Sequence, residues 1–206
     1  MTAWLTRVVL NPRHPAVRRD LTDAAGMHQR VMSMLPDDLG DQPRREAGVL
    51  YRLDTTVDAT LLLVQTTLRT DLTKLPDGYG ATATRDITAL LAALSDEMPV
   101  HYRIAANPSK RAASGRDKGS LVALSGVAAE SWWHHKAEQH GLALQTLTAV
   151  AQPAARTKES KMRHAVTRFD GRAIITNVDQ TRQAVLGGIG RGRAYGCGLL
   201  SLAPVR

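Results

Sequence analysis

One series of local patterns runs through the first half of the chain and begins again in the second half. In the first half, runs of β-branched and apolar residues alternate with segments that carry apolar residues at helical spacing. The predicted strands are residues 3–10, 48–53, 60–68 and 100–106, and the predicted helices are 20–35 and 83–94. This order of strand, helix, strand, strand, helix, strand is that of a ferredoxin-like unit, an antiparallel sheet backed by two helices.

The second half repeats the order. Its predicted elements are strands at 120–125, 143–151, 162–175 and 196–202, and helices at 127–140 and 179–186. The stretch between the halves, PSKRAASGRDKG, is basic and rich in Gly and Ser, which is typical of a loop or linker. The sequence therefore predicts an α+β fold of two tandem ferredoxin-like (βαββαβ) domains, with antiparallel sheets each backed by helices, over residues 1–107 and 120–206 and joined by 108–119.

The charge of the chain lies almost entirely in its second half. Residues 1–102 hold 11 Lys and Arg against 13 Asp and Glu, a net charge of −2, whereas residues 103–206 hold 16 against 6, a net charge of +10. Like charges concentrated in one half favour a polyanionic partner, so nucleic acid is the first partner to consider. A basic protein with no nucleic-acid partner is the alternative, and charge alone does not separate the two.

Cysteine content and the N-terminal segment favour the cytoplasm. Cys197 is the only cysteine, so no intrachain disulfide forms and nothing indicates an oxidising compartment. The apolar run at the N-terminus is broken by Arg7, which makes it too short for a signal-peptide core or a membrane span, and we expect no membrane partner.

The most distinctive motif is the string GGIGRGRAYGCGLLSLAP at residues 187–204. Six of its first twelve residues are glycines: Gly187, Gly188, Gly190, Gly192, Gly196 and Gly198. Glycine lets the backbone approach phosphate closely, and Arg191 and Arg193 supply charge and forked donors, so the string is suited to binding RNA. A dinucleotide-binding turn is excluded because only a short strand follows it. The structural alternative is a flexible bulged turn.

His28 is the candidate for chemistry. It lies on or beside an apolar stripe formed by Leu21, Ala25, Met32 and Leu35 at spacings of three and four. An imidazole titrates near neutrality and can therefore take or give a proton in cleavage of RNA without a metal. A histidine in such a stripe is also commonly a half-buried packing residue, and the spacing alone does not decide.

Two basic segments are candidates for contact with RNA. Strand alternation in the first, residues 156–172, predicts Lys161 and Arg163 on one face and His164 on the other, and we select Lys158, Lys161 and Arg163 as RNA-binding residues. In the second segment, Lys110 and Arg111 could contact phosphate. Solvated charged loops would look the same in sequence. No histidine or carboxylate spacing makes a convincing metal site, and we expect no cofactor.

Three motifs resemble one known family. The ending GxGRxRxYGCGLLSLAP is similar to the glycine-rich signature of the repeat-associated RNA-processing proteins, and its GCGLLSLAP portion resembles the CasE branch of type I-E CRISPR systems. The segment HYRIAANPSKR, at 101–111, resembles the strand and basic turn in the middle of the same family's chains, and the first strand followed by a helix with one histidine also matches.

The resemblance implies a metal-independent endoribonuclease, with His28 as its catalytic histidine. Such an enzyme binds the stem-loop of CRISPR repeat RNA, cuts at its base by attack of a 2′-hydroxyl, and stays with the mature CRISPR RNA as a subunit of a Cascade-type surveillance complex. One departure is clear, because many relatives carry a tyrosine where this sequence has Ala25. A non-catalytic subunit of the same fold that holds guide RNA therefore remains an alternative, and a DNA-binding protein is a weaker one.

Overall fold

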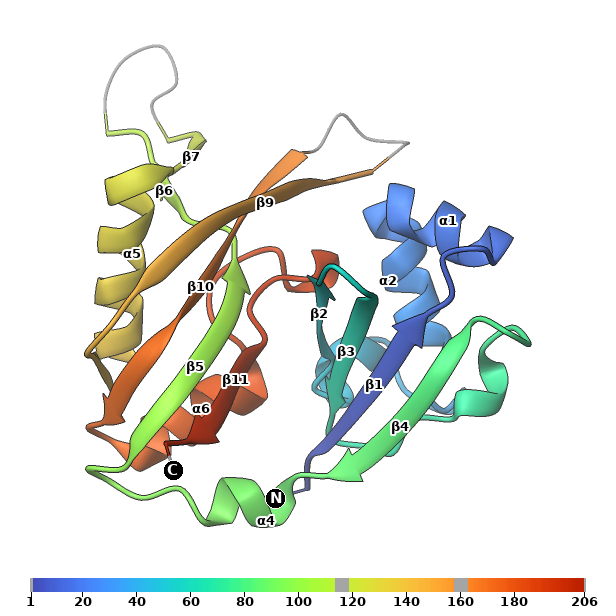
Figure 1. The fold of residues 1–206 in the computed structure, drawn as a ribbon, viewed down its shortest axis with the longest axis horizontal. Helices are drawn as coiled ribbons and strands as arrows, with labels where there is room; N and C mark the ends of the chain where they lie inside the picture. The colour runs from blue at the N-terminus through green and yellow to red at the C-terminus, as the bar shows by residue number, and fades with distance from the viewer. Residues whose placement is uncertain (1, 114–118, 158–162, 206) are drawn as a thin grey trace.

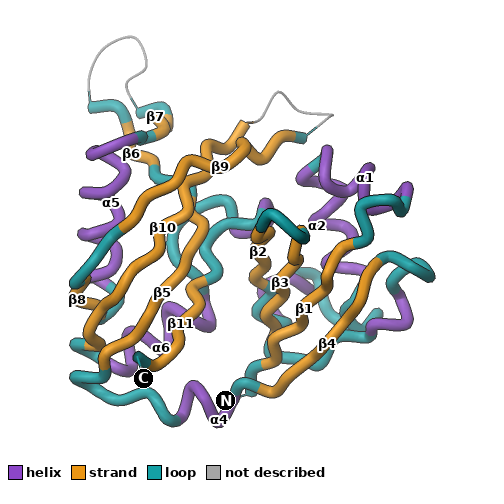
Figure 2. Tube along the Cα trace, viewed as in Figure 1, coloured by secondary structure: helices purple, strands orange, loops and turns teal. Residues whose placement is uncertain are grey.

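The computed structural model describes residues 2–113, 119–157 and 163–205. Within these ranges, two antiparallel sheets stand side by side, and each packs its helices on one face (Figure 1 and Figure 2). Helix α4 (Thr88–Ala92) connects the two sheets at the lower edge of this view, where both ends of the chain also lie. No helix in these ranges is long and apolar enough to cross a membrane.

The first sheet has the strand order of a ferredoxin-like unit. Its strands are β1 (Trp4–Leu10), β2 (Leu50–Thr55), β3 (Thr60–Thr66) and β4 (Gly80–Asp86), in the spatial order β2-β3-β1-β4. Alternation along β1 turns Val8 and Leu10 toward helices α1 (Pro15–Thr22) and α2 (Ala24–Ser33), which supply Val17 and Met27 to the same core. Two short helices lie in the connections of this sheet: α3 (Pro43–Glu46) precedes β2, and the single turn η1 (Leu72–Lys74) lies between β3 and β4.

The second sheet has the same ferredoxin-like strand order as the first, with one additional strand. Its strands are β5 (Pro99–Ala106), β8 (Leu142–Leu144), β9 (Thr148–Arg156), β10 (Arg163–Ile175) and β11 (Leu200–Pro204). The spatial order is β11-β5-β10-β8, with β9 also pairing with β10. Helices α5 (Gly126–Gln139) and α6 (Val178–Gly187) cover one face. The predicted α+β fold of two tandem ferredoxin-like units is therefore confirmed.

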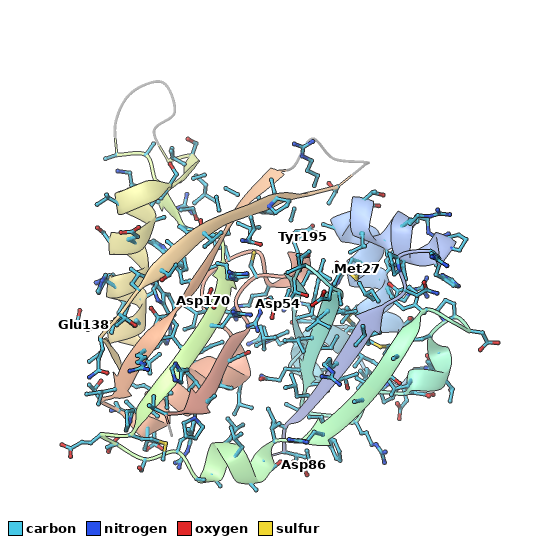
Figure 3. The ribbon with its side chains drawn as sticks, in the orientation of Figure 1. Met27, Asp54, Asp86, Glu138, Asp170 and Tyr195 are labelled. Carbon is cyan, nitrogen blue, oxygen red and sulfur yellow. The ribbon has the colours of Figure 1, made fainter. Side chains whose placement is uncertain are left out.

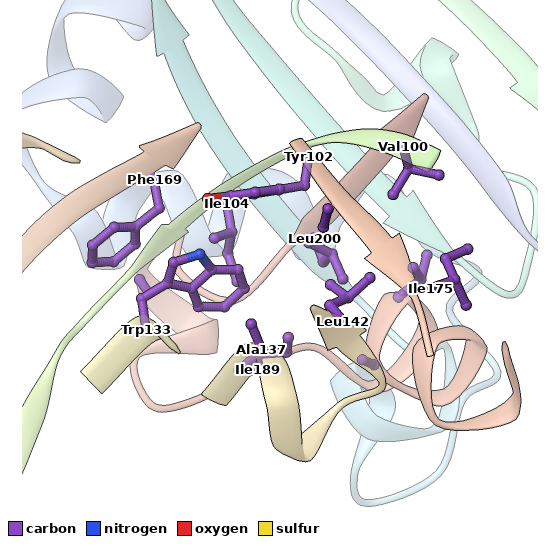
Figure 4. Close-up of a cluster of buried hydrophobic side chains, with 14 of the residues drawn as sticks. Val100, Tyr102, Ile104, Trp133, Ala137, Leu142, Phe169, Ile175, Ile189 and Leu200 are labelled. Carbon is purple, nitrogen blue, oxygen red and sulfur yellow. The ribbon is translucent and has the colours of Figure 1, made fainter. Parts of the chain in front are cut away.

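Aromatic side chains fill the core between α5 and the second sheet. Trp133 is fully buried, and its ring stacks on Phe169 of β10 with 5.7 Å between the centroids (Figure 4). Tyr102 of β5 meets the same indole at 5.7 Å. Burial of side chains of this size stabilises a fold by about 1.5–3 kcal/mol each, so this cluster fixes α5 on the sheet.

Two of the predicted elements are placed differently in the structure. The strand predicted at 100–106 exists, but its predicted membership of the first unit is wrong, because β5 pairs with β10 and β11 in the second sheet. The helix predicted at 83–94 is also wrong in its first part, where β4 pairs with β1 and only Thr88–Ala92 is helical. The first sheet thus ends at Asp86 and the second begins at Pro99.

The basic segment after β5 contains a small ribbon of its own. Strand β6 (Ser109–Arg111) pairs with β7 (Leu121–Ala123) in a separate two-stranded sheet. The strand predicted at 120–125 to begin the second main sheet is therefore assigned to the wrong sheet. The sequence places β7 correctly along the chain, but β5 occupies the position that β7 was expected to fill.

The predicted helix at 20–35 is broken into two. Asp23 has an extended backbone with φ −139° and ψ 111°, and its side chain accepts a hydrogen bond from the Ala25 amide at 3.2 Å. A short carboxylate side chain at this place caps a new helix more favourably than it continues an old one. Asp23 is therefore the N-cap of the helix that carries His28.

Buried polar contacts join the two units. Arg52 of β2 donates through Nε and Nη2 to both carboxylate oxygens of Asp54, at 2.8 and 3.0 Å. Its Nη1 donates to the carbonyl oxygens of Arg103 (3.2 Å) and Leu199 (3.0 Å), which belong to the second unit. Gln65 Nε2 of β3 donates to the Val185 carbonyl at 2.6 Å. These bonds fix the two sheets relative to each other, so that side chains from both can build one site.

Candidate active site

The His28 side chain lies half-buried on α2, a helix of the first unit that also contacts β9 of the second unit. Its Nδ1 atom is buried and has no hydrogen-bond partner. Burial, and secondarily the positive charge of Arg44, lower the pKa of this imidazole below its ordinary value. The neutral form is therefore favoured at neutral pH, and a neutral imidazole is able to take a proton.

The glycine-rich loop packs directly against the helix of His28. Its centre is a single helical turn, η2 (Arg193–Tyr195), which contacts α2 and β2. Gly192 and Gly196 flank the turn in the left-handed region, at φ 74° and 82°, where residues with a side chain are strained. The loop is thus fixed against the helix that carries His28.

Hydrogen bonds hold this loop in one conformation. The Tyr51 hydroxyl donates to the Ala194 carbonyl at 2.9 Å, and the Gly198 amide donates to the Ala105 carbonyl at 2.7 Å. A second contact across the loop runs from the Ile189 amide to the Gly198 carbonyl at 3.0 Å. The backbone of the loop is thus hydrogen-bonded to both units.

Arginine side chains gather at a pocket beside the glycine-rich loop. Arg44 of α3 lines a pocket of about 700 Å³ together with Arg191 and Arg193 of the glycine-rich loop. Burial, and secondarily the charge of Arg44, lower the pKa of Arg193, so these two guanidinium groups repel each other. Such a pair is costly until an anion lies between the two charges, which is the electrostatic condition for binding phosphate.

Another histidine, His164, lines this pocket. The ring of His164, on β10, stacks on Tyr195 with 5.0 Å between the centroids and an angle of 25°. Its Nε2 atom is buried without a hydrogen-bond partner, and burial lowers the pKa of the ring. Both rings line the pocket that Arg44 lines.

Tyr195 lies between this pocket and a second one. The second cavity, of about 470 Å³, is bounded by α1 and α2 on one side and by the β9–β10 hairpin on the other. Tyr195 and Met27 of α2 both line it, and Figure 3 shows them on facing elements at the junction of the two units. The glycine-rich loop therefore forms a wall shared by two cavities next to His28.

The structure places the predicted RNA-binding residues in three groups. Arg191 and Arg193 lie at the pocket beside Arg44. Lys110 and Arg111 lie exposed on the β6–β7 ribbon, where Arg111 donates to the Gly119 carbonyl at 2.8 Å. Lys158 and Lys161 are outside the described residues. The backbone of Arg163 begins β10 and pairs with that of Arg156, and an irregularity between His164 and Val166 interrupts the predicted alternation.

Sequence reasoning missed Arg44 and the role of His164 in the pocket. Arg44 and Arg45 form a basic pair within a net acidic half, which is a weak signal, and only the fold brings Arg44 beside residues about 150 positions later. In the described ranges, no group of three or more His, Cys, Asp or Glu side chains gathers in the manner of metal ligands.

The two ferredoxin-like units together form an arginine-lined pocket that contains a histidine. Such a protein is suited to binding a polyanion and to transferring one of the polyanion's protons. Residues 3–204 match the model of a family described as CRISPR associated protein, and the chain belongs to that family. It is 29% identical over 218 residues to the CRISPR-associated endoribonuclease Cse3 of Thermus thermophilus, a match that covers 98% of this chain and 100% of that protein.

Solved structures agree with this family over nearly the whole chain. Thermus thermophilus Cse3 bound to an RNA representing a pre-cleavage complex matches with a TM-score of 0.86 and 26% identity, covering 99% of this chain and 100% of that one. A chain of a CRISPR RNA-guided surveillance complex in a pre-nicking state is 39% identical, with a TM-score of 0.69 and coverage of 98% and 100%.

Proposed function

We propose that this protein is a metal-independent endoribonuclease that binds the stem-loop of CRISPR repeat RNA and cleaves it at the base of the stem. The observation that carries the proposal is the half-buried His28, whose lowered pKa favours the neutral imidazole, beside the paired guanidinium groups of Arg44 and Arg193. The RNA-bound Cse3 of Thermus thermophilus has the same fold, which supports the assignment of substrate.

The chemistry follows from these groups. The ribose 2′-oxygen attacks the adjacent phosphorus, a P–O2′ bond forms, and the P–O5′ bond breaks. Neutral His28 takes the proton of the 2′-hydroxyl, and the departing 5′-oxygen takes a proton from water. The His28 imidazolium then gives its proton to the hydroxide that remains, which restores the neutral imidazole. Arg44 and Arg193 stabilise the negative charge that builds up on the phosphorane oxygens, an effect that is stronger in a partly desolvated site. The products are a 2′,3′-cyclic phosphate and a 5′-hydroxyl.

The rest of the surface is suited to holding the stem. The second half of the chain carries the whole positive excess of the protein, and its β9–β10 hairpin faces α1 and α2 across the 470 Å³ cavity (Figure 1). A duplex RNA stem is recognised mainly through its shape and its phosphates, which a basic hairpin can follow. Lys158, Lys161, Arg163, Lys110 and Arg111 remain our candidates for these contacts.

After cleavage, we expect the protein to keep its product and to act as a subunit of a Cascade-type surveillance complex. The similarity to a chain of a CRISPR RNA-guided surveillance complex supports this expectation. The cytoplasm, where such RNA is made, is the proposed place of action.

The proposal is tested by cleavage of labelled repeat RNA in EDTA. We expect the unaltered protein to cut at one position, and the His28→Ala variant to bind the hairpin with the same affinity but to cut at least ~100-fold more slowly, because general base catalysis typically contributes that much or more. His134→Ala is the matched control, since His134 is exposed on α5 and outside the site.

The alternative is a subunit that holds guide RNA without cutting it. Tight hairpin binding by the unaltered protein, with no cleavage at any pH between 6 and 9, would favour this alternative and refute the nuclease. Preference for duplex DNA over the RNA stem in a competition assay would refute both.

A further inference from the structure

The pocket beside His28 has features that the chemistry of His28 does not use. Besides the three arginines, its lining includes Asn107 at the end of β5, Ser109 on the β6–β7 ribbon and His164 on β10. Its volume of about 700 Å³ lies within the range of about 300–1,000 Å³ that is typical of pockets for small organic ligands. A duplex stem is too wide for such a pocket, whereas a single nucleotide fits it.

His164 supplies the observation that points to a ligand. Its Nε2 atom is buried without a partner, and a buried polar atom left unpaired is destabilising. The ring cannot easily turn away, because it stacks on Tyr195 at 5.0 Å. The Asn107 side chain holds the adjacent backbone by donating to the Ala165 carbonyl at 2.7 Å. The imidazole is therefore fixed in place, and its Nε2 atom has no hydrogen-bond partner.

The pocket is next to the proposed site of cleavage. Arg44 is close enough to His28 to lower its pKa, and the same guanidinium acts on Arg193 in the pocket wall. A strand whose scissile phosphate lies at His28 would therefore place a neighbouring nucleotide within reach of the pocket. Unpaired nucleotides are recognised in proteins by hydrogen bonds to their exposed edges and hydroxyl groups, and by charge on their phosphates.

We propose that this pocket binds one unpaired nucleotide next to the base of the stem, with a hydrogen bond to Nε2 of His164. The inference rests on the proposed function for the identity of the RNA. His164 is thus a specificity residue that senses the single strand outside the hairpin, whereas the stem itself is held elsewhere on the protein.

Equilibrium binding tests this inference without any cleavage. The protein carries His28→Ala throughout, and two RNAs are compared: the stem-loop with its flanking single strands, and the bare stem-loop. We expect His164→Ala to weaken binding of the flanked RNA about 5- to 10-fold, the worth of one hydrogen bond of about 1–1.4 kcal/mol, and to leave binding of the bare stem-loop unchanged. That second binding also shows that the variant is folded.

A second variant distinguishes the hydrogen bond at Nε2 of His164 from the stacking of the His164 ring on Tyr195. His164→Phe keeps a flat ring for stacking but has no nitrogen, so we expect it to lose as much affinity for the flanked RNA as His164→Ala. Full affinity of His164→Phe would show that the ring only supports Tyr195 and would overturn the inference, as would equal losses on both RNAs or no loss on either. Failure of the nuclease itself would instead appear in the separate cleavage assay on His28→Ala.

Discussion

Replacing Gly198 with alanine should disrupt the glycine-rich loop, and two features of the structure set the size of the effect. Gly198 has φ +91°, and a Cβ atom built on it would lie 2.8 Å from the Ile189 carbonyl oxygen, a backbone atom that cannot move freely. The left-handed backbone costs a residue with a side chain about 1–2 kcal/mol, and overpacking of this kind costs a further 1–3 kcal/mol. Gly198→Ala should therefore lower the free energy of unfolding by about 2–5 kcal/mol.

The same loop offers a matched control. Gly187 ends α6 with an ordinary φ, and nothing lies within 4 Å of the place of its Cβ. Alanine is favoured over glycine in a helix, so Gly187→Ala should leave stability unchanged or raise it by up to ~1 kcal/mol. Urea unfolding followed by circular dichroism measures both variants. Equal stability of the two would refute the conclusion that the backbone of this loop is fixed by close contacts.

Further predictions concern charge and burial. Arg44→Met removes a charge that lowers the pKa of His28, so the pKa of His28 should rise. Because His28 must be neutral to take a proton, the acidic limb of the pH–rate profile should move to higher pH. An unmoved limb would count against His28 as the general base. Arg52→Met removes the bidentate partner of buried Asp54, which keeps only its longer contact with Arg103 at 3.8 Å, and it also removes the bonds that Arg52 makes to the second unit. The variant should therefore destabilise the protein by about 3 kcal/mol in urea, whereas a loss under 1 kcal/mol would show that the contact between the units contributes little. Burial raises the pKa of Cys197 to about 12, so its thiol should react with an alkylating reagent only after unfolding, and rapid labelling of the native protein would contradict the packing.

The sequence predicts elements well where the signal is local. The first strand and the helix at 127–140 follow from apolar runs and spacing, and the structure has β1 and α5 there. The segment of β4, GATATRD, was misread because it is an edge strand with no buried residue, so its alternation carries no hydrophobic signal. The pairing of β5 with β10 and β11 could not be predicted from the sequence, since strand order along the chain does not determine which sheet a strand joins.

The candidate site shows the same division. The position of His28 could be selected from the resemblance of motifs, and the structure puts it beside the predicted glycine-rich loop. The break at Asp23, which sets the direction of the helix, depends on one side chain that competes for a backbone amide. Arg44 and His164 have no sequence signal that sets them apart from other basic residues, because their roles arise only where α3 and β10 meet the loop.

The chemical nature of the cut ends distinguishes attack by the ribose from attack by water. Mass spectrometry of the products formed from repeat RNA in excess EDTA would identify them. We expect one upstream fragment ending in a 2′,3′-cyclic phosphate, or the 3′-phosphate to which it hydrolyses, and one downstream fragment beginning with a 5′-hydroxyl. Fragments with a 3′-hydroxyl and a 5′-phosphate would show that water, and not the ribose, attacks the phosphorus, and would contradict the mechanism built on His28.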